Sequence, residues 1–239
     1  MGVETILGKI TIPVERPRVS RHRLLAALKE SLRTCSSTVV SGRAGAGKTL
    51  LAAEFARGCG RRAAWYKVEA PDVKLQSFLH YLVTSVARAL PGFGSSTSAL
   101  GAMPPAGAGP EDRADAYVDD LQRWGESFLL VVDDLHLVYD ADWVVPFFRR
   151  LLPLLPAEVH LLILGRGLPP APLWRLRSKQ RLCLIDEPAL AFTRAEAEEL
   201  FGSYGLGAEA AGRGWAETRG RAAALDARAR RAVRSEVSA

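Results

Sequence analysis

The sequence predicts an α/β fold of the P-loop NTPase class, with a mainly parallel five-stranded sheet flanked by helices and a small C-terminal helical segment. Short apolar runs bounded by turn residues alternate with longer segments of helical period, as in βαβ units. Residues 42–49 match G-x-x-x-x-G-K-S/T directly after one such run. Another run, 128–132, ends in two aspartates.

The expected strands are the five apolar runs at 38–40, 63–68, 128–132, 159–164 and 182–185. The expected helices between them are 48–56, 75–90, 114–124 and 143–155. Residues 91–110 are mostly Gly, Pro, Ser and Ala, with no charge and no periodicity, which indicates a flexible surface insertion between two helices.

Three regions follow from this pattern. Residues 1–37 form a lead-in and a first helix on the adenine side, residues 38–187 form the P-loop core, and residues 188–239 form a helical segment with an Arg/Ala-rich tail. Thr193 and Glu196 have capping-box spacing, so a helix begins there and ends at a glycine. A final helix is expected at about 215–233.

The glycine-rich motif predicts a phosphate-binding loop. Its glycines let backbone N–H groups turn inward around a β-phosphate, and the following helix points its positive end at the same place. Lys48 supplies an ammonium for the β- and γ-oxygens, and the Thr49 hydroxyl is a ligand for Mg²⁺. The expected nucleotide-binding residues are Gly42, Ala44, Gly45, Ala46, Gly47, Lys48, Thr49 and Leu50.

The aspartates that follow residues 128–132 predict the second half of such a site. Asp133 would hold Mg²⁺ through its water shell, and Asp134 would polarise an attacking water. A helix N-cap or a loop acid is the alternative for Asp134. Arg166 follows the run 159–164 and is a candidate for reading the γ-phosphate, or else a solvated loop arginine. His136 is interpreted as a surface or hydrogen-bonded core histidine.

Residues 17–25 precede the first helix and contain Arg18 and Arg21. They either fold over a nucleotide base or form a basic turn, and the residues alone do not choose between these.

Composition limits the class of protein. With 239 residues, 48% hydrophobic and 24% charged, the chain is too large for a mini-protein and too apolar for a disordered tail. The net charge of +6 permits an anionic partner. Three widely spaced cysteines and the lack of an apolar leader or membrane span indicate a cytoplasmic protein. Glycines within 192–215 argue against a DNA-reading helix-turn-helix, so direct DNA readout is not expected.

The order of these blocks resembles the nucleotide-binding module of the signal-transduction ATPases with numerous domains, in the branch of large MalT-like regulators of the LuxR class. The resemblance covers most of residues 11–220. It implies a regulatory ATP/ADP switch that hydrolyses ATP slowly with Mg²⁺ and engages a protein partner or assembles with itself in the ATP state. By position, it implies phosphate and metal contacts for Lys48, Thr49 and Asp133, catalysis by Lys48, Asp134 and Arg166, and adenine contacts for Arg18 and Arg21.

Members of this family continue into further domains, so a chain ending at Ala239 is expected to be truncated relative to them. Gly220-Arg221 stands where members often carry Gly-Trp. Three alternatives remain open: a nucleotide-locked module without turnover, an AAA+-like ATPase acting on DNA, and a P-loop kinase, for which the sequence shows no separate lid or acceptor-site signature.

Overall fold

A parallel sheet of five strands is the centre of the molecule. The computed structural model describes residues 6–93, 109–171 and 182–237. The strands are β1 (Ser37–Ser41), β2 (Arg62–Lys67), β3 (Phe128–Asp133), β4 (Val159–Gly165) and β5 (Leu182–Ile185). They lie in the order β2-β3-β4-β1-β5, and every pairing is parallel. The five predicted strands are confirmed, and the sheet is parallel throughout rather than mainly so.

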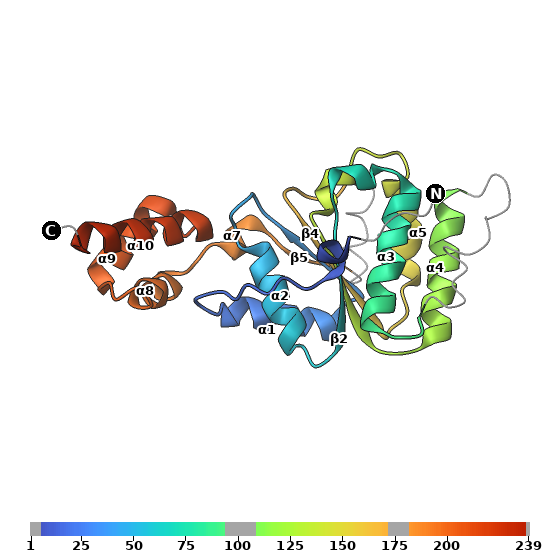
Figure 1. Cartoon of the computed structure of the whole chain (residues 1–239), viewed down its shortest axis with the longest axis horizontal. Coiled ribbons are helices and arrows are strands. Elements are labelled where there is room, and N and C mark those ends of the chain that lie inside the picture. The colour runs from blue at the N-terminus through green and yellow to red at the C-terminus, as the bar shows by residue number, and fades with distance from the viewer. Residues whose placement is uncertain (1–5, 94–108, 172–181, 238–239) are drawn as a thin grey trace.

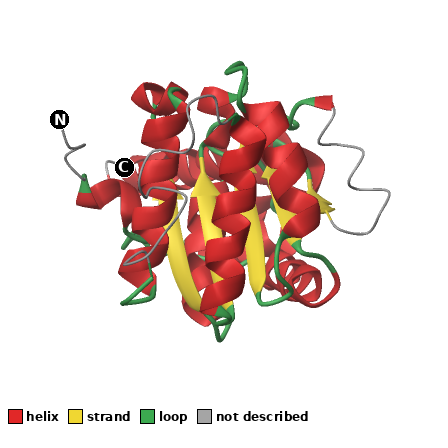
Figure 2. Ribbon diagram, turned by 90° about the vertical axis from the view of Figure 1, so that its right-hand side faces the viewer, coloured by secondary structure: helices red, strands yellow, loops and turns green. Residues whose placement is uncertain are grey.

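Helices cover both faces of this sheet (Figure 2). The two on one face are α1 (His22–Thr34) and α2 (Lys48–Gly58), and the three on the other are α3 (Leu75–Ala89), α4 (Pro110–Trp124) and α5 (Val144–Leu154). Because successive strand residues point to opposite faces, β3 supplies both cores. Leu130 and Val132 pack with α3, α4 and α5, and Leu129 and Val131 pack with α1 and α2.

Short 3₁₀ turns complete the core: η1 (Leu7–Ile10), η2 (Ala70–Val73) and η3 (Leu135–Val138). Buried Lys9 of η1 pairs with Asp72 of η2, with Nζ 2.6 and 2.7 Å from the two carboxylate oxygens. This ion pair fixes the N-terminal segment beside β2 and α3.

The predicted insertion at 91–110 is partly wrong. Its residues 94–108 lie outside the described part of the chain. Phe93, however, is buried against Trp124, with ring centroids 5.9 Å apart, so Phe93 belongs to the core, whereas Pro91 and Gly92 are exposed. Pro110 is the first residue of α4, a position that suits its fixed φ and missing N–H.

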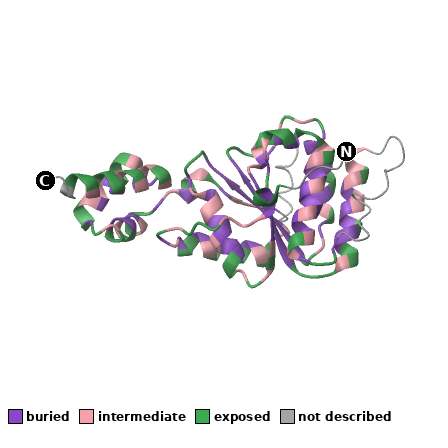
Figure 3. Ribbon diagram, viewed as in Figure 1, coloured by how far each residue is buried: buried purple, intermediate pink, exposed green. Residues whose placement is uncertain are grey.

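The C-terminal segment folds into α7 (Glu187–Leu190), α8 (Arg194–Gly202), α9 (Ala208–Thr218) and α10 (Ala222–Val237), which extend from one end of the molecule (Figure 1). The predicted capping box is confirmed, since Thr193 Oγ1 accepts from the Glu196 N–H and Glu196 accepts from the Thr193 N–H. These helices have an apolar cluster of their own. In Figure 3 the buried segments gather around the sheet, whereas the C-terminal helices are mostly exposed or half-buried.

The single helix predicted at 215–233 is wrong. The chain breaks between α9 and α10 because Arg219 and Gly220 have φ values of +52° and +71°. A Cβ on Gly220 would lie 2.4 Å from the carbonyl oxygen of Phe192, so this turn requires glycine. The sequence suggested that Gly214 would break a helix, but it does not. It lies inside α9, where the absence of a side chain lets the Phe201 ring of α8 approach.

The described residues contain no helix that is both long and apolar enough to cross a membrane.

A buried chain of polar side chains joins α1, β1 and β4. Ser31 and Thr38 hydroxyl oxygens lie 2.5 Å apart, Thr38 Oγ1 lies 2.9 Å from His160 Nε2, and His160 Nδ1 donates to the Cys35 carbonyl at 3.1 Å. Because the carbonyl only accepts, His160 Nδ1 carries the proton and Nε2 accepts from Thr38. Burial lowers the pKa of His160 from 6.5 to about 4.

We expect His160 to make folding stability depend on pH. Above pH 6.5 the imidazole is neutral in both states, but below it only the unfolded chain takes up the proton, so stability falls as the pH falls toward 4, by about 3 kcal/mol in total. Urea unfolding of the wild type and of His160→Asn between pH 4 and 8 measures this. The variant should show the shallower pH dependence. Exposed His22→Asn is the control, and an equal slope in all three proteins would contradict the assignment.

Candidate functional site

The predicted phosphate loop lies between β1 and α2. Gly45 and Gly47 have φ values of +78° and +80°, the left-handed region that glycine adopts without strain. Lys48 is the first residue of α2, so the unpaired N–H groups of that helix face the end of the loop. Of the residues that the motif predicts to bind nucleotide, Gly42 and Ala46 are buried, Ala44 is exposed, and Leu50 lines a cavity beside the loop.

Lys48 is held inside the loop. Its ammonium donates to the carbonyl oxygens of Gly42 at 2.5 Å and Arg43 at 3.0 Å, and the residue is only 7% exposed. Burial lowers the pKa of Lys48, the charges of Asp134 and Asp133 oppose this shift, and the charge of Arg166 adds to it. The structure therefore brings the lysine, both aspartates and the arginine within electrostatic reach of one another.

Thr49 and Asp133 lie side by side at the end of the sheet. The Thr49 hydroxyl donates to Asp133 Oδ2 at 3.0 Å, and the Asp134 N–H donates to the other oxygen at 2.9 Å. Burial and the neighbouring Asp134 charge raise the pKa of Asp133 to about 6. A hydroxyl beside a buried carboxylate is a donor set of hard oxygen atoms, which fits Mg²⁺.

Asp134 has a left-handed backbone conformation. Its φ of +56° is unusual for a residue other than glycine, and it follows directly after β3. Asp134 occupies the N-cap position of η3, as the alternative expected, but its side chain makes no capping hydrogen bond. Its carboxylate remains beside Lys48 and Asp133, whose pKa values it shifts.

His136 differs from its interpretation as a surface or hydrogen-bonded core residue. Its side chain is 15% exposed, and within the described residues its buried Nδ1 has no hydrogen-bond partner. This nitrogen lies 3.7 Å from Asp134 Oδ1. Arg166 is exposed immediately after β4, and its charge helps to lower the pKa of His136, which burial lowers most. The imidazole therefore belongs to the cluster around Asp134.

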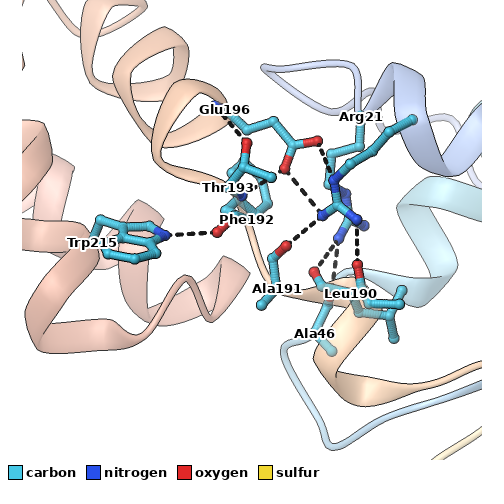
Figure 4. A network of polar contacts seen from close by, with 10 residues as sticks. Arg21, Ala46, Leu190, Ala191, Phe192, Thr193, Glu196 and Trp215 are labelled. Carbon is cyan, nitrogen blue, oxygen red and sulfur yellow. Dashed lines mark hydrogen bonds and ion pairs between the residues drawn. The ribbon is translucent and has the colours of Figure 1, made fainter.

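The lead-in segment and the C-terminal helices border a cavity of about 330 Å³ beside the loop, lined in part by Arg18, Leu50, Phe192, Ala222 and Asp226. The Arg18 guanidinium lies 4.2 Å from the centre of the Tyr204 ring. Arg21 also borders the cavity, but its guanidinium is buried and bonds to main-chain carbonyls (Figure 4).

Sequence reasoning missed the contribution of α10. The Ala223 N–H donates to the Gly45 carbonyl at 2.9 Å, and a Cβ on Gly45 would lie 2.8 Å from the Ala223 side chain. A second cavity, of about 500 Å³, lies between Arg43, Glu187 and the turn that carries Arg219 and Arg221. The run of three small residues after Gly220, at 222–224, is the one sequence signal of this close approach.

Most of this chain aligns with named relatives. It is 32% identical over 197 residues to the HTH-type transcriptional regulator MalT of Serratia proteamaculans (strain 568), covering 82% of this chain and 21% of that one. The identity to MalT of Cronobacter sakazakii (strain ATCC BAA-894) is 28% over the same length and coverage. The chain thus spans about a fifth of these relatives.

Solved structures show the same fold. A signal-transduction ATPase with numerous domains (STAND) and a tetratricopeptide repeat sensor from Pyrococcus horikoshii superposes with a TM-score of 0.61 at 18% identity, over 87% of this chain and 30% of that one. Cdc6p of Pyrobaculum aerophilum superposes with a TM-score of 0.51 at 17% identity, over 81% and 50%.

The family comparison covers the core of the site. The AAA ATPase domain matches residues 19–164, a range that begins before Arg21, includes the phosphate loop, and ends within β4. This match spans more than half of the 239 residues. The chain belongs to the AAA ATPase domain family.

Proposed function

We propose that this chain binds ATP or ADP with Mg²⁺ at the carboxyl end of its sheet and hydrolyses ATP slowly, as a nucleotide-dependent regulatory switch. The observation that carries the proposal is the hydrogen bond between Thr49 and Asp133, formed next to a lysine held inside the phosphate loop. This pairs a metal-binding element with a phosphate-binding element, as nucleotide hydrolysis requires.

In this proposal the loop binds the β- and γ-phosphates through backbone N–H groups and Lys48. Thr49 and Asp133 would hold Mg²⁺, with Asp133 acting through the water shell of the ion. The bound metal would neutralise charge on the phosphate oxygens. Binding would also favour the ionised form of Asp133, whose pKa burial has raised to about 6.

Asp134 would orient the water that attacks the γ-phosphate in line, and Arg166 would contact the γ-phosphate oxygens. Their support is electrostatic proximity to Lys48. Asp134 has one methylene fewer than glutamate, so its carboxylate reaches less far from the strand, and slow turnover is expected for that reason. The base would occupy the cavity that Arg18, Leu50 and Phe192 help to line.

The regulatory part of the proposal is supported by the MalT relatives, which carry the name of transcriptional regulators, and by the likeness to a STAND protein. A protein partner or self-assembly in the ATP state would read the switch, in the cytoplasm. Direct DNA readout by this chain is not proposed.

The test is to purify the protein without added nucleotide, denature it, identify any released nucleotide by chromatography, and then follow phosphate release from ATP with and without Mg²⁺. Retained ADP with slow, Mg²⁺-dependent turnover supports the switch. Retained ADP with no phosphate release favours a nucleotide-locked module. Turnover that rises steeply with DNA or protein concentration favours an AAA+-like ATPase acting on DNA. A protein that neither retains nor binds nucleotide contradicts the proposal.

A further inference from the structure

Arg21 lies behind the phosphate loop, on the side of its carbonyl groups. The residue is 5% exposed, and its three acceptors are all main-chain oxygens. Nη1 donates to Leu190 at 2.8 Å and to Ala46 at 3.3 Å, and Nη2 donates to Gly47 at 2.8 Å. A Cβ on Gly47 would lie 2.8 Å from Nη2, so the glycine permits this approach.

Two of these carbonyls share peptide groups with the donors of the phosphate site. The Ala46 oxygen belongs to the peptide group whose N–H is that of Gly47, and the Gly47 oxygen to the one whose N–H is that of Lys48. A cation bonded to the oxygen of a planar peptide group fixes its orientation and polarises its N–H. Hydrogen bonds with a charged partner are also the stronger kind. Arg21 thus acts on the loop amides from the opposite side.

We propose that Arg21 is a positioning residue for the nucleotide phosphates, because it orients and polarises the Gly47 and Lys48 amides through the carbonyls behind them. This inference rests on the proposed function and adds a residue that touches neither the phosphates nor the metal. It differs from the adenine contact that the resemblance implied for Arg21. Its guanidinium already bonds to three carbonyls, which leaves the base contacts to other residues of the cavity.

The same arginine connects the loop to the C-terminal helices. Leu190, its third partner, is the last residue of α7 and precedes the linker to α8. The carbonyl of Gly45 accepts a hydrogen bond from the N–H of Ala223 in α10. Three successive carbonyls of the loop are therefore bonded to groups outside it. Phosphate binding that fixes the loop would therefore stabilise the packing of the C-terminal helices against it. By the same coupling, packing of these helices against the loop would raise the affinity for phosphate by the same factor.

Arg23 provides an internal comparison. Its guanidinium bonds to the carbonyls of Ala189 and Ala191 and to the Glu196 carboxylate, so it holds the same linker as Arg21. Among the described residues, its hydrogen bonds go to α7, the linker and α8 rather than to the phosphate loop, and its side chain is 37% exposed. A variant at Arg23 therefore loosens the linker while the carbonyls of Ala46 and Gly47 keep their donor.

The experiment compares Arg21→Met with Arg23→Met in the full chain. Calorimetry measures affinity for ADP and for inorganic pyrophosphate, and saturation-transfer NMR measures affinity for adenosine. We expect Arg21→Met to weaken ADP and pyrophosphate binding about tenfold to a hundredfold, as for loss of charge-assisted hydrogen bonds, and to leave adenosine binding unchanged. Arg23→Met should change ADP affinity by no more than about threefold, the size expected for an exposed ion pair.

Arg21→Lys separates positioning from folding. The lysine ammonium can donate to the Ala46 and Gly47 carbonyls, so Arg21→Lys should bind pyrophosphate more tightly than Arg21→Met and less tightly than the wild type. If Arg21→Met does not fold, Arg21→Lys takes its place in the comparison with Arg23→Met. Equal losses in the Arg21 and Arg23 variants, or an equal loss for adenosine and ADP, would overturn the inference while Lys48→Ala still tests the proposed function. A wild-type chain that binds neither ADP nor pyrophosphate would overturn both.

Discussion

Substitution of Lys48 by alanine is expected to abolish nucleotide binding. The ammonium is the charged donor inside the loop, and it is already partly dehydrated there. Its removal leaves backbone N–H groups alone to balance the charge of the phosphates. A loss of at least about a hundredfold in ADP affinity is expected, since the hydrogen bonds to a charged group and the ion pair are lost together. Titration with a fluorescent ADP analogue measures it.

The control for this variant is Lys29→Ala, which removes the same charge from the exposed face of α1. Urea unfolding must accompany both, because Lys48 also bonds to the Gly42 and Arg43 carbonyls. A folded Lys48→Ala protein that binds ADP as tightly as the Lys29 control would refute the phosphate-loop assignment.

The sheet was predictable because its strands are buried on both faces. All six residues of β3 are buried, and the first five appear in the sequence as a continuous apolar run rather than an alternating one. The glycines of the loop were predictable for a local reason as well, since Gly45 and Gly47 occupy left-handed backbone. The proximity of the loop to Asp133 follows from topology, because parallel strands bring their carboxyl ends to one edge.

What the sequence did not reveal depends on contacts between distant residues and main-chain atoms. Arg21 bonds to the carbonyl of Leu190, which is 169 residues away, and a carbonyl carries no sequence signature. The break between α9 and α10 is similar. Arg219 is an ordinary helix former, and its left-handed backbone follows from the tight approach of Gly220 to Phe192. Local propensity favoured one continuous helix, and tertiary packing overrode it.

The second large effect is expected at Asp134. Replacement by asparagine keeps the size of the side chain, and asparagine accepts positive φ about as readily as aspartate, so the backbone at +56° should be retained. The amide cannot take up a proton from an attacking water. Phosphate release from ATP and Mg²⁺ should therefore slow by about a hundredfold or more, as for loss of a catalytic base.

Nucleotide affinity in the same variant should not fall together with phosphate release. The charge of Asp134 helps to raise the pKa of Asp133, so its removal should lower that pKa and keep the Asp133 carboxylate ionised for Mg²⁺. ADP affinity in Mg²⁺ should be retained or increased while turnover falls. Exposed Asp140→Asn, in the turn after η3, is the control and should change neither quantity. Unchanged phosphate release in Asp134→Asn would remove this residue from the mechanism. A loss of ADP affinity that parallels the loss of phosphate release would assign it a structural role, because a group that acts only on the attacking water changes phosphate release without weakening ADP binding.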